Sequence, residues 1–246
     1  MATHFARGTL SDGYLLSNRL SAACHHQARQ LPEHRRTRFL TSRALLAELM
    51  FMLYGISELP EIVVQPGGKP VFLDNMLPRF SIAYTGNIVG VALTTEGDCG
   101  LALALQRPAA QGNERYSFTS NETLWINNQN DPNEACAQLL ALRQSVLKLT
   151  GEAESHSLTL LPGSGRLRAA SVPQIEAVCD AEAVLVWSVA VTPAIERLKV
   201  WEYTGKGSWC CLPDPQVRAR EPAGRLMHFT SLTAEKAFTL NESDQN

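Results

Sequence analysis

The chain has 246 residues, of which 45% are hydrophobic and 19% are charged, and its formal net charge at pH 7 is −2. A chain of this length can bury a substantial core and fold as one large domain or two small ones. The near-neutral charge gives no electrostatic reason to expect nucleic acid or an anionic membrane as a partner. Any site for an anion must therefore be local.

Targeting signals and paired cysteines are not recognisable in the sequence. The first residues lack the basic stretch and apolar run of an export signal, and the longest apolar segment, 44–54, is interrupted by Glu48. None of the six cysteines belongs to a Cys-x-x-Cys pair, so neither a zinc site nor a disulfide framework is expected. We predict a cytoplasmic protein with reduced thiols and no membrane span.

The first half of the chain begins with its strongest helical pattern. Apolar side chains recur at helical spacing over residues 34–53, between Pro32 and Gly55. A Pro- and Gly-rich turn follows, and then three short segments of strand character at 79–83, 88–94 and 99–105. The pattern predicts a helix followed by an antiparallel meander.

The second half repeats this order. The polar segment 108–115 contains Pro and Gly without periodicity, which is typical of a linker. Helices are predicted over 120–127 and 133–149, the second ended by Gly151, and strands over 157–161 and 183–192. We therefore predict an α+β fold of two pseudo-symmetric lobes, 1–110 and 111–246. Each lobe would be a helix packed on a small antiparallel sheet, with a ligand cleft between them, and such an internal duplication favours a monomer.

Basic residues cluster at the start of the first long helix. Arg35, Arg36 and Arg38 open it, and Arg43 follows about one and a half turns later. They form either a solvated basic face or an anion site, because guanidinium groups near a helix start offer forked donors beside unpaired backbone N–H groups. Lys69, in a Gly-Lys-Pro turn, is likewise either a turn lysine or an anion ligand.

Six segments, taken in order, resemble the signature of the 4′-phosphopantetheinyl transferases. The resemblance covers about residues 30–151. It is to the two-lobed class of this family, which includes the enzymes that serve nonribosomal peptide and polyketide assembly. The segments are Arg-Arg-x-Arg-Phe-Leu-x-x-Arg-Ala-Leu-Leu (35–46), Gly-Lys-Pro (68–70), Phe-Ser-Ile-Ala-Tyr-Thr-Gly (80–86), Gly-Leu-Ala-Leu-Ala (100–104), Phe-Thr-Ser-Asn-Glu (118–122) and Arg-Gln-Ser-Val-Leu-Lys-Leu-Thr-Gly (143–151).

The resemblance implies a specific chemistry. Coenzyme A would bind between the two lobes, with Mg²⁺ bridging its pyrophosphate. A serine of an acyl or peptidyl carrier protein would attack the β-phosphate, and adenosine 3′,5′-bisphosphate would leave. The implied partners are thus coenzyme A and a carrier protein.

The resemblance also implies roles for individual residues. Arg43 and Lys69, and less directly Arg36, match residues that hold the nucleotide phosphates. Lys148 matches the lysine at the reacting pyrophosphate, where it offsets charge on the leaving group. Glu122 matches an acidic residue near the metal.

Several positions depart from the family pattern. The family strand Gly-x-Asp-x-Glu places two carboxylates on one face, aimed at one metal, but this chain has Ala102 and Ala104 there. A third carboxylate, counted as a ligand or as the route to a base, is replaced by Gln144. The histidine of a Ser-His-Ser-x-Gly element near the coenzyme is replaced by Tyr84.

These departures leave the function open between two main hypotheses. The first is a transferase whose metal site and catalysis are weakened because Ala102, Ala104 and Gln144 replace three carboxylates of the family. The second is an inactive protein that binds coenzyme A and a carrier protein. A third is a module that shares only the fold. Alanine at both strand positions would result either from deliberate removal of two ligands or from natural loss in a paralogue.

Overall fold

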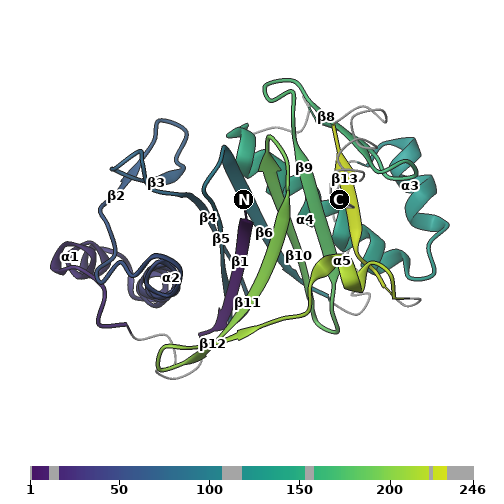
Figure 1. Ribbon diagram of the computed structural model, residues 1–246. Helices are drawn as coiled ribbons and strands as arrows, with labels where there is room; N and C mark the ends of the chain where they lie inside the picture. The colour runs from purple at the N-terminus through teal and green to yellow at the C-terminus, as the bar shows by residue number, and fades with distance from the viewer. Residues whose placement is uncertain (1, 11–16, 107–117, 153–157, 222–223, 232–246) are drawn as a thin grey trace, which may run out of the picture.

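The computed structural model describes residues 2–10, 17–106, 118–152, 158–221 and 224–231. The protein is a mixed α+β fold in which two sheets pack side by side, with helices on their outer sides (Figure 1). The predicted linker at 108–115 and the predicted lobe boundary at 110 both lie outside the described residues.

The described strands form sheets of five, six and two strands. The five-stranded sheet has the order β12 (Ser208–Cys211), β11 (Arg197–Gly205), β1 (Ala2–Thr9), β5 (Ile88–Thr94), β4 (Arg79–Thr85). The six-stranded sheet has the order β6 (Asp98–Leu105), β10 (Leu185–Thr192), β9 (Glu176–Ala181), β13 (Met227–Thr230), β8 (Arg166–Ala169), β7 (Leu158–Leu161). The third sheet is the hairpin β2 (Ile62–Val64) and β3 (Pro70–Phe72).

The long helices lie where the sequence predicted them. The described helices are α1 (Ala22–Gln30), α2 (Glu33–Tyr54), α3 (Ser120–Asn127), α4 (Pro132–Thr150) and α5 (Pro215–Arg218). Gly55 and Gly151 end α2 and α4 with φ of 69° and 73°, a left-handed conformation that glycine adopts without a Cβ penalty. The cap residues thus fix the ends of both helices from local sequence.

The predicted meander of the first half is wrong in one strand. β4 and β5 do pair as an antiparallel hairpin, but β6 pairs with β10 in the other sheet rather than with β5. The reason is the small side chains on one face of β6, which admit α4. A Cβ on Gly100 would overlap the backbone carbonyl of Ser145 in that helix.

Strands from both halves of the chain share each large sheet. β6 comes from the first half and lies beside β10, whereas β11 comes from the second half and pairs in parallel with β1, with Phe5 opposite Val200. Sequence reasoning missed β1 and β11, because a parallel pair between strands this far apart leaves no local turn signal.

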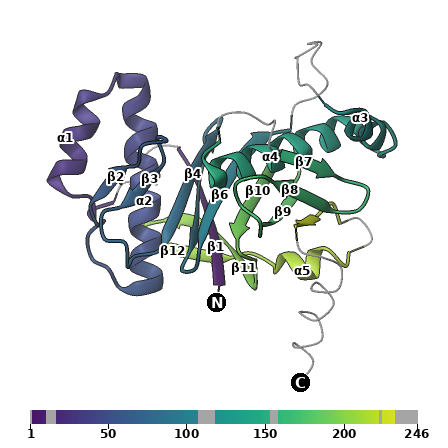
Figure 2. The same cartoon turned by 90° about the horizontal axis from the view of Figure 1, so that it is seen from above.

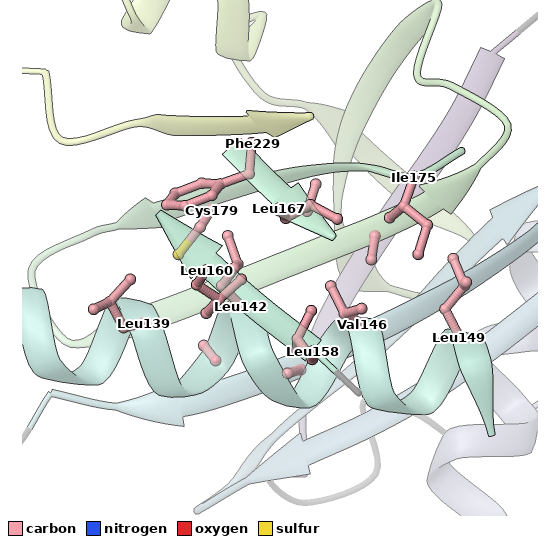
Figure 3. Packing of buried hydrophobic residues seen from close by; sticks show 14 of the residues in the cluster. Leu139, Leu142, Val146, Leu149, Leu158, Leu160, Leu167, Ile175, Cys179 and Phe229 are labelled. Atoms are coloured by element: carbon pink, nitrogen blue, oxygen red, sulfur yellow. The ribbon is translucent and has the colours of Figure 1, made fainter. Parts of the chain in front are cut away.

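Three apolar clusters hold the layers together. The first lies between α2 and the five-stranded sheet, and the second lies between the two sheets, where Trp187 and Phe5 pack with ring centroids 5.0 Å apart. The third lies beneath α4, whose Leu142 and Val146 meet Leu160 and Phe229 (Figure 3). Seen from above, α2 and α4 therefore lie on opposite sides of the paired sheets (Figure 2).

Two further expectations concern membranes and thiols. Among the helices of the described residues, none combines the length and the apolar character needed to cross a membrane. All six cysteines are free thiols, with Cys99 and Cys179 fully buried and Cys210 and Cys211 exposed on β12.

Candidate functional site

A cavity of about 540 Å³ opens where the edges of the two large sheets meet. It is lined by α2, the β2–β3 hairpin, β4, β6 and α4, so residues of both halves of the chain face it. Twelve described residues line it: Phe39, Arg43, Val64, Gly68, Pro70, Ile82, Ala83, Tyr84, Ala102, Leu103, Gln144 and Lys148.

Helical periodicity places the polar side chains of α4 in this cavity. Leu142, Val146 and Leu149 point into the core, three or four residues apart. Gln144 and Lys148, four residues apart, share a different face of the helix and line the cavity. One helix thus serves the core and the site with separate faces.

Arg43 is the principal cation on the α2 side. Its guanidinium carbon lies 4.3 Å from the centroid of the Phe39 ring, one turn earlier, and its Nη1 donates to Ser42 Oγ at 3.2 Å. Burial lowers the pKa of Arg43, since the charged form loses water. Within the described residues no carboxylate pairs with it, and four of its five N–H donors remain free for a ligand.

Lys148 is the cation on the opposite wall. Its Nζ donates to the backbone oxygen of Ile82 in β4 at 3.0 Å, which bridges α4 to the first sheet. Although the residue as a whole is exposed, desolvation of the amino group lowers the pKa of Lys148 to about 8. No described acidic side chain forms an ion pair with it, so two of its three N–H donors are available.

An aromatic side chain lies at the rim. Tyr84 is 47% exposed although it lines the cavity, and the guanidinium carbon of Arg38 lies 5.7 Å from its ring centroid. This pair presents a flat apolar face and a positive charge together, which is suited to a heteroaromatic ring or a phosphate.

Lys69 lies between two lining residues but is partly committed elsewhere. Its Nζ donates to Asp98 Oδ1 at 2.6 Å and to the backbone oxygen of Cys99 at 2.9 Å. Asp98 is thus held by Lys69 and, at 3.4 Å, by Arg79. One N–H donor of Lys69 remains for a ligand.

Arg36 lies away from the cavity. Its guanidinium donates to the backbone oxygens of Ala28, Arg29 and Leu31 at 3.2 to 3.3 Å. These carbonyls belong to the end of α1, where the last turn has no helical donors of its own. These contacts give Arg36 a structural role at the end of α1, and the phosphate-binding role expected from the sequence stays a prediction.

Glu122 is also outside the lining of the cavity. Its carboxylate is 1% exposed and receives a hydrogen bond from Arg143 Nη2 at 2.6 Å, while the backbone N–H of Thr119 donates to its other oxygen at 3.0 Å. Thr119 completes a capping box at the start of α3. Both oxygens of the predicted metal ligand are therefore occupied by the protein.

The described residues do not fit a magnesium site. Mg²⁺ is held by one or two carboxylates plus phosphate oxygens and water, yet none of the residues that line the cavity is acidic. Ala102 lines the cavity, and Ala104 packs beneath α4. No described group of three His, Cys, Asp or Glu side chains is arranged to hold a metal ion.

The structure therefore brings together Arg43, Tyr84, Gln144, Lys148 and the vacated position 102, and leaves Lys69 at the edge. Sequence reasoning missed Phe39, whose signal is its spacing of four residues from Arg43 on the same helix. It also missed Arg143 as the partner of Glu122, for which a contact across 21 residues gives no local signal.

Comparisons with known proteins found one relative that matches the whole chain and one that matches about a third of it. No family model matches the chain. The chain is 59% identical over 249 residues to "Uncharacterized protein YieE" of Escherichia coli strain K12, which covers 98% of this chain and all of that protein, and the same holds for strain CFT073. It is 35% identical over 91 residues to "4'-phosphopantetheinyl transferase AcpT" of strain K12, covering 37% of this chain and 43% of that one.

The fold and the cavity define a mixed α+β protein with a cavity that contains two cations and no carboxylate among its described lining residues. Within that class, the chain belongs to the family of the E. coli protein YieE. Its similarity to a phosphopantetheinyl transferase is partial and makes a transferase-type activity a subject for proposal.

Proposed function

We propose that this chain is a protein of the 4′-phosphopantetheinyl transferase type that binds coenzyme A in the cavity between α2 and α4. The observation that carries the proposal is a pair of cations, Arg43 and Lys148, which line one cavity without acidic partners among the described residues and whose charged groups are partly desolvated. Desolvation disfavours a charge unless an opposite charge lies close to it, and a bound polyanion would supply that opposite charge to both groups. The partial similarity to AcpT supports coenzyme A as that polyanion.

We also propose that the fold consists of two lobes with the cavity between them. One helix packs on each large sheet, α2 on the first and α4 on the second, which supports two pseudo-symmetric lobes with the ligand cleft between them. We assign the lobes to residues 1–110 and 111–246, with β6 and β11 exchanged between sheets. A cytoplasmic monomer is the proposed state.

Ligand contacts are assigned by position in the cavity. Arg43 binds a phosphate through its free forked donors, and Lys148 lies across the cavity, where it neutralises the pyrophosphate. Tyr84 and Arg38 hold the nucleotide at the rim, and Lys69 contributes its remaining donor. The amide of Gln144, four residues before Lys148, is placed to orient an incoming hydroxyl group.

The proposed reaction transfers the phosphopantetheine arm to a serine of a carrier protein. The serine oxygen forms a bond to the β-phosphorus, the bond from that phosphorus to the bridging oxygen breaks, and adenosine 3′,5′-bisphosphate leaves. The serine proton passes to water, because none of the described residues that line the cavity is a carboxylate base. Losing one preorganised charge typically costs about 10²- to 10³-fold in rate, so transfer is slow.

The acid-free lining favours a second candidate, a protein that binds coenzyme A and a carrier protein without transfer. The two candidates share the cavity and differ only in turnover. A transfer assay with labelled coenzyme A and an apo carrier protein separates them, since the first gives slow labelling and the second none.

Calorimetric titration of coenzyme A tests the shared site. Arg43→Ala removes a charge-assisted contact of about 1.5 to 3 kcal/mol, so we expect affinity to fall about 10- to 100-fold. Arg35→Ala is the matched control, because Arg35 is exposed on the same helix and does not line the cavity. Equal affinity in the two variants would remove Arg43 from the site, and no binding by the wild-type protein would refute the proposed function.

A further inference from the structure

The cavity contains two positive charges of the protein itself, which bear on whether the site needs a metal ion. A divalent cation would bring two positive charges to a bound pyrophosphate, and the cavity already contains two, on Arg43 and Lys148. They come from two different helices, Arg43 from α2 and Lys148 from α4, and both line the same cavity.

The acidic groups that would recruit a metal are withdrawn from this cavity. Glu122 is held by Arg143 at 2.6 Å and by a backbone N–H, and Asp98 is held by Lys69 at 2.6 Å. Position 102, which faces the cavity, carries a methyl group. Each candidate carboxylate is thus either absent or neutralised by a cation of the same chain.

From this geometry we propose that the cavity is a metal-independent site for a polyphosphate ester, in which Arg43 and Lys148 supply the charge that a divalent cation would otherwise bring. The inference rests on the proposed function for the identity of the ligand, coenzyme A. It makes the charge state of Lys148 a determinant of affinity.

The surroundings of Lys148 decide how its proton behaves. Desolvation lowers its pKa to about 8 in the free protein, and a bound polyanion favours the charged form. Affinity is therefore constant below about pH 7, where the amine is charged in both states, and falls as the free amine deprotonates above its pKa of about 8.

Other titratable groups near the cavity are few. The hairpin and β6 contribute only apolar or small lining residues, and on its own helix Lys148 follows Gln144 by one turn. Beyond α4 the charged group next along the chain is Glu152, which is not among the residues that line the cavity. The titratable and charged groups that face or border the cavity are Arg43 and Arg38 of α2, Lys69 of the hairpin, Tyr84 of β4 and Asp98 of β6.

The test measures coenzyme A affinity by calorimetry in magnesium chloride and in EDTA, from about pH 6.5 to pH 9.5. For the wild-type protein we expect the same affinity within about twofold in both buffers, and a loss of up to about tenfold per pH unit above pH 8. The second phosphate ionisation, near pH 6, is nearly complete above about pH 7.5, so it does not contribute to a loss of affinity above pH 8.

Two variants assign the pH dependence to one group. Lys148→Arg keeps the charge over the whole range, so its affinity should not fall above pH 8. Lys148→Met removes the charge, so its affinity should be at least about tenfold weaker at pH 7 and no longer fall with pH. Because the same ligand is used throughout, its own ionisation would appear equally in every variant.

The outcomes separate the inference from the proposed function. Binding that magnesium strengthens tenfold or more would overturn metal independence and leave the coenzyme A site standing. A wild-type pH profile that persists unchanged in Lys148→Arg would overturn the role of Lys148. Absence of binding in both buffers would overturn the proposed function and this inference together.

Discussion

At the scale of single residues, the sequence pattern and the contacts of a side chain give different roles for Glu122 and Arg36. Both residues are polar at positions that match a ligand-binding family, and both are bound to protein groups in the structure. By contrast, Arg43 and Lys148 have free donors and face a cavity. Free hydrogen-bonding groups, rather than residue type, distinguish the residues that we propose bind a ligand from those whose groups are held by the protein.

Glu122 provides a prediction at this scale. Glu122→Ala leaves Arg143, whose side chain is 15% exposed, without its partner, and breaking a buried pair in this way costs about 3 to 5 kcal/mol. We expect chemical denaturation to show this loss, with a smaller loss for Glu122→Gln, which can still accept from Thr119.

A role of Glu122 in metal binding would give a different result. In that case Glu122→Gln would retain most of its stability but lose any effect of magnesium on coenzyme A affinity. Under the structural role, the affinity of folded Glu122→Gln stays within about twofold of wild type, because Glu122 does not line the cavity.

At the scale of elements, the contact between α4 and β6 positions the site. Gly100 lies directly against the backbone of Ser145, and the Ser145 hydroxyl is 2.8 Å from that of Ser188 on β10. The close approach brings Gln144 and Ala102 to the same cavity. Small residues in one strand thus determine where a helix and its cavity-lining face lie.

Gly100→Ala tests this contact. The added Cβ would overlap the Ser145 carbonyl, and overpacking of this kind costs about 2 to 3 kcal/mol, so we expect the melting temperature to fall by roughly 5 to 10 °C. Coenzyme A affinity should fall as well, because α4 must shift. Gly163→Ala is the control, since a Cβ there meets nothing within 4 Å, and an equal loss in both variants would contradict the account.

At the scale of the whole molecule, strand exchange couples the two halves. β6 completes the sheet of the second half, and β11 extends the sheet that contains β1. The apolar layer between the sheets, with Trp187 against Phe5, is built from both halves. The molecule therefore depends on contacts that neither half makes alone.

Fragments of the chain test this dependence. We expect residues 1–106 and 118–246, produced separately, to show little cooperative thermal unfolding by circular dichroism, because each exposes the face that the other covers. Mixed or co-expressed fragments should elute as one complex and regain cooperative unfolding. Independent cooperative folding of either fragment would show that the exchanged strands are dispensable.

The sequence by itself determined the elements whose signals are local. Helices α2, α3 and α4 and the β4–β5 hairpin follow from apolar spacing and glycine caps within a few residues. The order of the motifs also selected Arg43, Lys148, Gln144 and Tyr84, which the structure places in one cavity.

Only the tertiary structure decided the partners of these elements. The alternation of Leu101 and Leu103 is equally compatible with β5 or β10 as a neighbour, and packing of α4 on the opposite face selects β10. In the same way, Glu122 meets Arg143, and Lys69 meets Asp98, across 21 and 29 residues. Such contacts depend on how whole elements are positioned in space, and the spacing of residues along the chain does not encode that arrangement.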